Sequence, residues 1–172
     1  MTWVAPEITR IEEPFIAGER SMLEGWLDFH RTTLLHKCAG LTGVQLANRA
    51  VPPSSLSLLG LIRHTADVER SWFRRHAHGE DVDYLYWRED MPDAALEEAD
   101  AALAEKDYAV LTLEWELSRR AVATHSLDDT FVTQRGNEIS LRWVYVHMIE
   151  EYARHNGHAD LLRERLDGST GY

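Results

Sequence analysis

The chain has 172 residues, and 44% of them are hydrophobic, so it can form one domain with a sizeable core and is not expected to be disordered. Its 18 Lys and Arg against 29 Asp and Glu give a formal net charge of −11. Such an acidic surface repels phosphate backbones, and no apolar stretch approaches the roughly 20 residues that a membrane span needs. We therefore expect a single domain over residues 1–172 that binds neither nucleic acid nor membrane.

The N-terminus and the cysteine content predict the compartment. The opening residues, MTWVAPEITRIEEPF, lack the basic start and the apolar region of a secretory signal. Cys38 is the single cysteine, which excludes an intramolecular disulfide and suits a reducing environment. We therefore expect a cytoplasmic protein, in which Cys38 is a small packed residue rather than a nucleophile.

Helical periodicity begins after an N-terminal arm of about residues 1–17. The first predicted helix covers about residues 18–38, and the second runs from about 56 to 78. Apolar residues at helical spacing define the inward face of each helix. On the second helix, this stripe is expected to contain Leu61, His64, Val68 and Ser71 or Trp72.

The second half of the chain predicts two more helices. The third starts at Asp93, and its heptad spacing indicates a bundle seam of Leu96, Leu103, Val110 and Leu117. The fourth covers about residues 141–166, with Ser140 as its N-cap and Gly168 as its stop signal. The link between them, SLDDTFVTQRGNEIS, is expected to be irregular or hairpin-like. Four helices without convincing strands predict an all-α four-helix bundle.

The fourth helix carries polar side chains where its core pattern requires apolar ones. Helical steps along its apolar face lead to Glu151, His155 and His158. His147 lies at the edge of the same face. An i, i+4 Glu–His pair is often only a surface ion pair. On an inward face, however, a carboxylate is costly to bury unless it is paired or bound to metal, so these positions favour a site.

The second helix supplies a matching polar residue, because His64 lies between Leu61 and Val68 on the inward stripe. Alone, His64 could be a hydrogen-bonded core residue. Together with Glu151 and His155 it would form a cluster of two histidines and one carboxylate between facing helices. Three protein ligands leave one coordination position open, as in catalytic metal sites. Zinc is the expected metal, and nickel, iron, cobalt or manganese also accept these ligands.

Two segments, LSLLGLIRHTADVERSWFRR and SLRWVYVHMIEEYARHNGHADLLRERLDG, resemble the second and last helices of the DinB-like family. This family of four-helix metal-binding proteins includes mycothiol-dependent maleylpyruvate isomerases and bacterial thiol S-transferases. The resemblance covers most of the chain and implies His64, Glu151 and His155 as metal ligands. Glu151 stands at the first position of the usual His-x-x-x-His, as in the mycothiol-using branch. His158 stands where the family has Gln, so it is either a ligand or a group behind the ligands.

The resemblance implies a metal-dependent thiol S-transferase or isomerase, with mycothiol as the thiol cosubstrate and a small electrophile as its partner. A coordinating cation deprotonates a thiol, whose ordinary pKa is about 8.5, and so creates a nucleophile at neutral pH. His158 or His147 would accept the proton or orient a ligand. The alternative is a non-catalytic protein that binds metal or a small ligand, and a non-haem iron oxygenase ranks behind both. The chain could also form a homodimer.

The connection between the second and third helices is longer than a bundle needs and contains Tyr84, Tyr86 and Trp87. One interpretation is an aromatic cluster that covers one end of the core. The other is a lid or rim that shapes the pocket above the metal. The second interpretation requires the segment to fold back along the bundle, because His64 precedes Gly79 by about 22 Å of helical rise.

Overall fold

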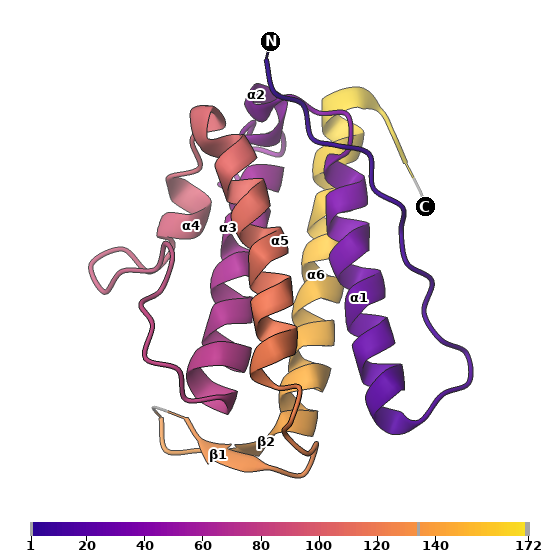
Figure 1. Ribbon diagram of the computed structural model, residues 1–172. Helices are drawn as coiled ribbons and strands as arrows, with labels where there is room; N and C mark the ends of the chain where they lie inside the picture. Colours follow the sequence, from indigo (N-terminus) through magenta and orange to yellow (C-terminus); the bar gives the residue numbers. More distant parts are fainter. Residues whose placement is uncertain (1, 134, 171–172) are drawn as a thin grey trace.

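The computed structural model describes residues 2–133 and 135–170, in which four long helices form the predicted bundle (Figure 1). The long elements are α1 (Glu19–Cys38), α3 (Leu58–Glu69) with its continuation η1 (Arg70–Ala77), α5 (Ala104–Ala121) and α6 (Leu141–Asp167). The connections contain the short helices α2 (Gly43–Leu46), α4 (Ala94–Glu97) and η2 (Ala101–Leu103). Within the bundle, α1 packs against α6, and α3 contacts both α5 and α6. No helix of the described residues is long and apolar enough to cross a membrane.

The first helix covers its predicted range, and the last has the bounds that its end signals predicted. The helix α1 follows the N-terminal arm and ends at Cys38. At the start of α6, the Trp143 backbone N–H donates to Ser140 Oγ, which satisfies one of the free donors at a helix N-terminus. At its end, Gly168 has a φ of 78°, in the left-handed region that glycine adopts without strain.

The predicted second helix has the expected extent but changes its winding. It begins after Ser57, whose hydroxyl accepts a hydrogen bond from the Gly60 N–H, and it ends at Ala77, two residues before Gly79, whose φ is 73°. Its last part, η1, is a π-helix of 8 residues. This wider winding is rare in proteins and is frequent at functional sites. Here it carries Trp72 and His76, which line a surface pocket described below.

The third predicted helix is interrupted, and its predicted seam is only partly right, because Leu96 and Val110 pack against the core whereas Leu103 does not. Its first turn, α4, follows Asp93 as expected, but the chain leaves the helix before η2 and α5 begin. Leu103 of the expected seam is 41% exposed. The buried face of α5 instead contains Ala104, Asp107, Leu111, Glu114, Trp115 and Ser118. The seam was partly misplaced because hydrophobic spacing alone does not predict that two acidic residues face the core.

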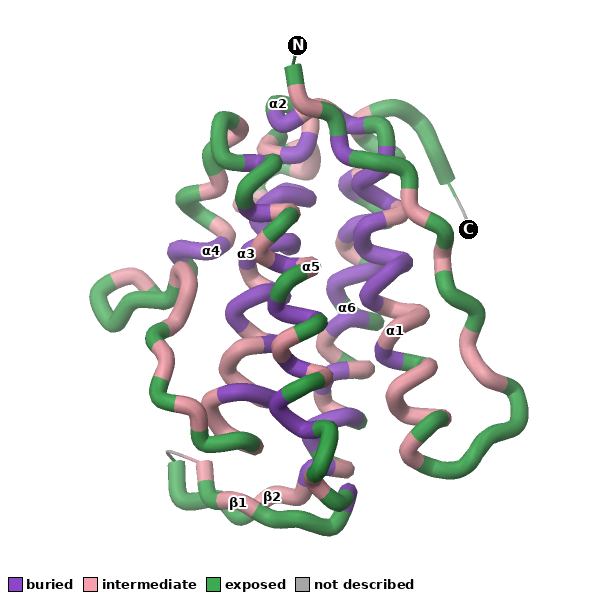
Figure 2. Tube along the Cα trace, viewed as in Figure 1, coloured by how far each residue is buried: buried purple, intermediate pink, exposed green. Residues whose placement is uncertain are grey.

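Buried ion pairs explain this orientation. Figure 2 shows the buried residues along the facing sides of the helices. Three carboxylates in this interior contact arginines at 2.6, 3.1 and 2.9 Å, in the pairs Arg31–Glu69, Arg63–Asp107 and Arg74–Glu114. Burying a charged side chain costs several kcal/mol of free energy unless the charge is paired. The arginines of α1, α3 and η1 therefore determine which acidic faces of the neighbouring helices turn inward.

A small hairpin closes one end of the bundle (Figure 1). Strands β1 (Thr130–Val132) and β2 (Glu138–Ser140) pair antiparallel, with Phe131 opposite Ile139. The hairpin contacts η1 through β1 and leads directly into α6. The hairpin-like alternative for this link is thus confirmed, and the expectation that the chain has no convincing strands is corrected by this one short pair.

The aromatic connection folds back along α3. Asp67 accepts backbone hydrogen bonds from the N–H groups of Leu85, Tyr86 and Trp87, at 2.6, 3.1 and 2.8 Å. The Tyr86 hydroxyl donates to the buried carboxylate of Asp107 at 2.9 Å. Because Asp67 lies one turn after His64, these bonds hold the segment near the level of the predicted metal ligands. Tyr86 is partly buried and packs against the core, whereas Trp87 is 43% exposed.

Candidate metal centre

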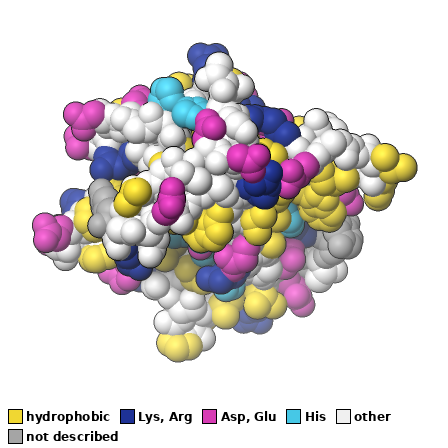
Figure 3. Space-filling model, turned by 90° about the horizontal axis from the view of Figure 1, so that it is seen from below, with side chains coloured by type: hydrophobic (Ala, Val, Ile, Leu, Met, Phe, Trp, Pro, Cys, Tyr) yellow, Lys and Arg dark blue, Asp and Glu magenta, His cyan; other side chains and the backbone are white. Residues whose placement is uncertain are grey.

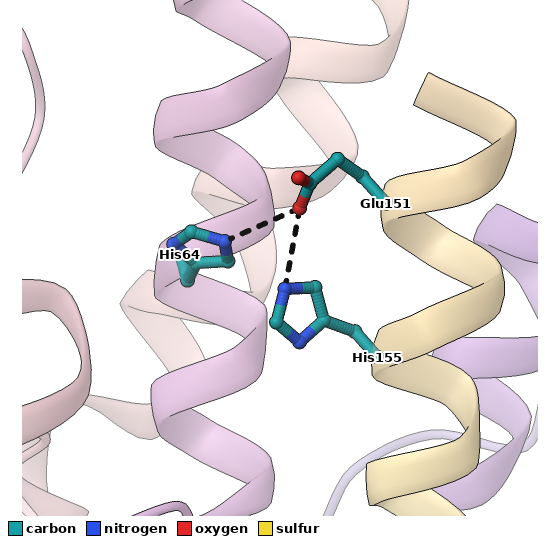
Figure 4. A group of neighbouring side chains, drawn as sticks. All are labelled: His64, Glu151 and His155. Atoms are coloured by element: carbon teal, nitrogen blue, oxygen red, sulfur yellow. Dashed lines mark ion pairs between the residues drawn. The ribbon is translucent and has the colours of Figure 1, made fainter. Parts of the chain in front are cut away.

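Three predicted ligands meet between α3 and α6 (Figure 4). Glu151 Oε2 lies 3.3 Å from His155 Nε2 and 3.8 Å from His64 Nε2. The ring centroids of His64 and His155 are 4.7 Å apart. One ligand atom from each residue falls within 4.8 Å of the other two. The structure thus brings together an imidazole of one helix with a carboxylate and an imidazole of another, around one point.

The helices set the electrostatics of this cluster. Glu151 and His155 lie one turn apart on α6, with their side chains 18% and 11% exposed, and His64 faces them from α3 at 30%. The cluster is therefore half-buried and opens on the His64 side. The neighbouring imidazole of His155, and then that of His64, holds the pKa of Glu151 well below its ordinary range. Glu151 is consequently an anionic carboxylate at neutral pH.

This donor set fits a divalent cation. Bonds of about 2.1 Å in a tetrahedral arrangement place ligand atoms about 3.4 Å apart. The observed separations of 3.3 and 3.8 Å from Glu151 Oε2 bracket this value. Among the described residues, this group contains no fourth His, Cys, Asp or Glu. Three donors with an open fourth position are the pattern of catalytic metal sites.

His158 contacts the cluster from behind. Its Nδ1 lies 3.3 Å from Nδ1 of His155, whose other nitrogen faces Glu151. Burial lowers the pKa of His158, and the neighbouring His155 and Arg154 lower it further, so His158 is a neutral imidazole at pH 7. Its Nδ1 can therefore accept a hydrogen bond from His155. Such a bond would fix the ring orientation of His155 with Nε2 directed at the cluster.

His147 approaches Glu151 from the other side. Its Nε2 lies 3.9 Å from Glu151 Oε1, the oxygen that does not face His64 and His155. The imidazole stacks on Trp143 with 4.8 Å between centroids and meets Trp72 edge-on at 4.9 Å. Two indoles thus hold the imidazole in place beside the carboxylate.

A second group, His147, Glu150 and Glu151, also has ligand atoms close together. Its geometry suits a metal less well. Nδ1 of His147 faces Glu150, whereas Nε2 faces Glu151, so the two carboxylates lie against different nitrogens of one ring. Glu150 also forms an ion pair with Arg154. The cluster of His64, Glu151 and His155 is therefore the candidate metal centre.

Sequence reasoning missed the buried network behind this centre. The Tyr152 hydroxyl donates to Glu69 at 3.0 Å and accepts from the Trp115 indole N–H at 2.9 Å. Glu69 in turn pairs with Arg31. The network holds the turn of α6 that carries Glu151 against α3 and α5. Charged residues at core-facing helical positions were its only signal in the sequence.

Cys38, the single cysteine, is fully buried at the end of α1. Burial raises the pKa of its thiol to about 12. The thiol is therefore protonated at neutral pH and inaccessible to a substrate. A nucleophilic sulfur at the candidate centre has to come from a small molecule.

Comparison with known proteins agrees with the fold. A family model described as mycothiol-S-transferase matches residues 22–168, from α1 to the end of α6. No curated protein and no solved structure matches the chain. The helical bundle is the DinB-like arrangement that the resemblance of the two helices implied. Because the match covers most of the chain, this protein belongs to the mycothiol-S-transferase family.

Proposed function

We propose that the protein is a divalent-metal-dependent S-transferase that joins mycothiol to a small electrophile. The observation that carries the proposal is the convergence of His64, Glu151 and His155 around one point with an open side, in a chain of this family. His64 and His155 would hold the metal through Nε2, and Glu151 through Oε2. A divalent cation held there supplies the positive charge that favours thiolate over thiol at neutral pH.

The charge of the ligands supports this chemistry. Glu151 contributes one negative charge, and the two imidazoles bind metal in their neutral form. The loaded site therefore retains a net positive charge toward an anionic sulfur. The open side at His64 leaves room for the sulfur beside the ligands. Zinc is our first choice of metal, because its usual ligands are nitrogen, sulfur and carboxylate oxygen at four positions.

His147 is the proposed acceptor of the thiol proton. Its Nε2 faces Glu151 beside the cluster, and its Nδ1 faces Glu150, whose side chain is 48% exposed. The thiol would give its proton to Nε2, and the proton on Nδ1 could leave toward the surface. The sulfur electron pair then forms the new carbon–sulfur bond, and the leaving group departs with the electron pair of the broken bond. His158 would act as a positioning residue, through its contact with His155.

Metal analysis followed by a thiol-depletion assay tests this function. The purified protein should contain about one divalent ion per chain, as two imidazoles and a carboxylate bind one ion. With mycothiol and a panel of electrophiles, the loaded protein should consume thiol faster than the chelated protein. Stoichiometric metal without turnover for any electrophile would instead support a non-catalytic metal-binding protein. Equal turnover before and after chelation would contradict metal dependence.

A further inference from the structure

A pocket of about 500 Å³ lies between η1, the aromatic connection, the hairpin and the start of α6. Four aromatic residues line it, Trp72, Tyr84, Trp87 and Trp143. Polar residues of the hairpin, Thr133, Arg135 and Asn137, also line it. We call this cavity the aromatic pocket. In Figure 3, which views the molecule from the hairpin end, hydrophobic side chains reach the surface between charged ones.

The aromatic pocket adjoins the candidate metal centre. The indoles of Trp72 and Trp143 line the pocket and also contact the ring of His147. His147 in turn faces Glu151 at 3.9 Å. One side chain therefore separates the pocket from a proposed metal ligand. Along α6, Trp143 precedes Glu151 by eight residues, or about 12 Å of helical rise.

Contacts with Asp67 and Arg75, and contacts between the lining residues themselves, hold the walls of the pocket in place. Asp67 anchors the backbone of Trp87, whose indole packs on Tyr84 with 4.9 Å between centroids. The guanidinium of Arg75 lies over the other ring of this pair, at 4.3 Å from the Tyr84 centroid. The pocket is thus built before any ligand arrives, which reduces the entropy that binding would cost.

The same walls leave binding groups unused. Trp87 and Trp143 are each 43% exposed, although indoles are among the side chains that proteins most often use for recognition. The side chains of Arg135 and Asn137 form no hydrogen bond or ion pair with other residues that the structure describes. Exposed aromatic faces and free polar groups in the lining of one pocket match a ligand with flat apolar faces and a hydroxylated edge.

We propose that the aromatic pocket binds the sugar portion of the thiol cosubstrate, an inference that rests on the proposed function. Mycothiol consists of N-acetylcysteine joined to a glucosamine–inositol unit. The C–H faces of such rings pack on indoles, and their hydroxyls hydrogen-bond to amide, hydroxyl and guanidinium groups. The cysteinyl arm then extends past His147 and places its sulfur at the open side of the metal centre.

The position of the pocket favours the thiol over the electrophile as its occupant. His147 stands between the pocket and Glu151, so a compact electrophile held in the pocket would lie away from the sulfur that attacks it. The sugar, in contrast, is covalently attached to the sulfur through an arm. Its binding in the pocket would raise the effective concentration of the thiol at the metal centre.

A comparison of two thiols tests the proposal on the metal-loaded enzyme. N-acetylcysteine keeps the reactive arm of mycothiol and lacks the sugar. Wild-type enzyme should prefer mycothiol. The ratio of kcat/KM for mycothiol to kcat/KM for N-acetylcysteine should fall about tenfold or more in Trp87→Ala, as expected for the loss of one aromatic wall. Arg135→Ala should lower the ratio as well. Trp26→Ala, an indole of α1 that is 36% exposed and lines none of these walls, should keep it.

A binding measurement separates this proposal from the proposed function. Isothermal titration of glucosaminyl-inositol, which contains no thiol, should show saturable binding to wild-type protein and about tenfold weaker binding to Trp87→Ala. This result would stand even if the protein transferred no mycothiol. If wild-type enzyme prefers mycothiol and Trp87→Ala keeps that ratio, the function stands and the pocket assignment is wrong. If Trp87→Ala raises the KM for the electrophile and leaves the KM for mycothiol unchanged, the pocket assignment is also wrong, and the pocket binds the electrophile.

Discussion

His147 Nε2 lies 3.9 Å from Glu151 Oε1, while the other oxygen of Glu151 faces both proposed histidine ligands. One carboxylate thus joins the candidate metal centre to an imidazole held between two indoles. Removing the carboxylate charge should affect metal binding, whereas removing the imidazole should affect proton transfer. The two residues can therefore be separated experimentally.

Glu151→Gln keeps the shape of the side chain and removes its charge. Because Glu151 provides the only anionic donor, metal affinity should fall by about 100-fold or more, measured by competition with a chromogenic chelator. Glu164→Gln, an exposed change on the same helix, should bind metal as the wild type does. Wild-type affinity in Glu151→Gln would remove this residue from the ligand set and make His158 the candidate third ligand.

His64→Ala and His155→Ala should each lose stoichiometric metal while the bundle stays folded. Each change leaves two of the three donors, and the ion pairs of the core do not involve either histidine. Elemental analysis measures the metal, and far-ultraviolet circular dichroism measures the helix content. His125→Ala, at the hairpin end, is the matched control and should keep full occupancy. Full metal occupancy in either ligand variant contradicts the proposed site.

His147→Ala should lower kcat with mycothiol by about 100-fold, the usual contribution of a general base, with little change in bound metal. The pH dependence of kcat provides the specific readout. The variant should regain rate as pH rises and the thiol ionises without the base. A variant with wild-type kcat and pH profile would limit His147 to packing between Trp72 and Trp143.

His158→Ala should weaken metal binding about 10-fold to 100-fold, as is usual when the partner of a histidine ligand is removed. At saturating metal the kcat should return toward the wild-type value, since the three ligands remain. His158→Gln, which retains a hydrogen-bonding group, should rescue part of the affinity. If His158→Ala loses metal as completely as His155→Ala does, His158 is itself a ligand.

Asp67→Ala should release the aromatic connection from α3. Three backbone N–H groups lose a charged acceptor, although a buried charge also disappears, so we expect a loss of about 2–4 kcal/mol of unfolding free energy. Urea denaturation measures this loss, and limited trypsin digestion at Arg88 measures the release. Asp67→Asn keeps one acceptor and should lose less. Unchanged cleavage at Arg88 in Asp67→Ala would show that other contacts hold the segment.

The sequence by itself determined the local features of this protein. Helix end signals predicted the bounds of α6, because a serine hydroxyl or a left-handed glycine acts within one turn. Helical geometry likewise placed Glu151 and His155 on one face. The sequence also identified His64 as a polar residue on an inward stripe, and the structure brings it to that pair.

Only the tertiary structure decided how distant segments meet. The face of α5 turns Asp107 and Glu114 inward because arginines of α3 and η1 pair with them. The spacing of hydrophobic residues along α5 does not reveal these arginine partners. The aromatic connection returns to α3 because Asp67 accepts its backbone N–H groups, which are 18–20 residues away. Periodicity is a property of one helix, whereas the pairing of buried charges and backbone donors depends on which elements share a common interior.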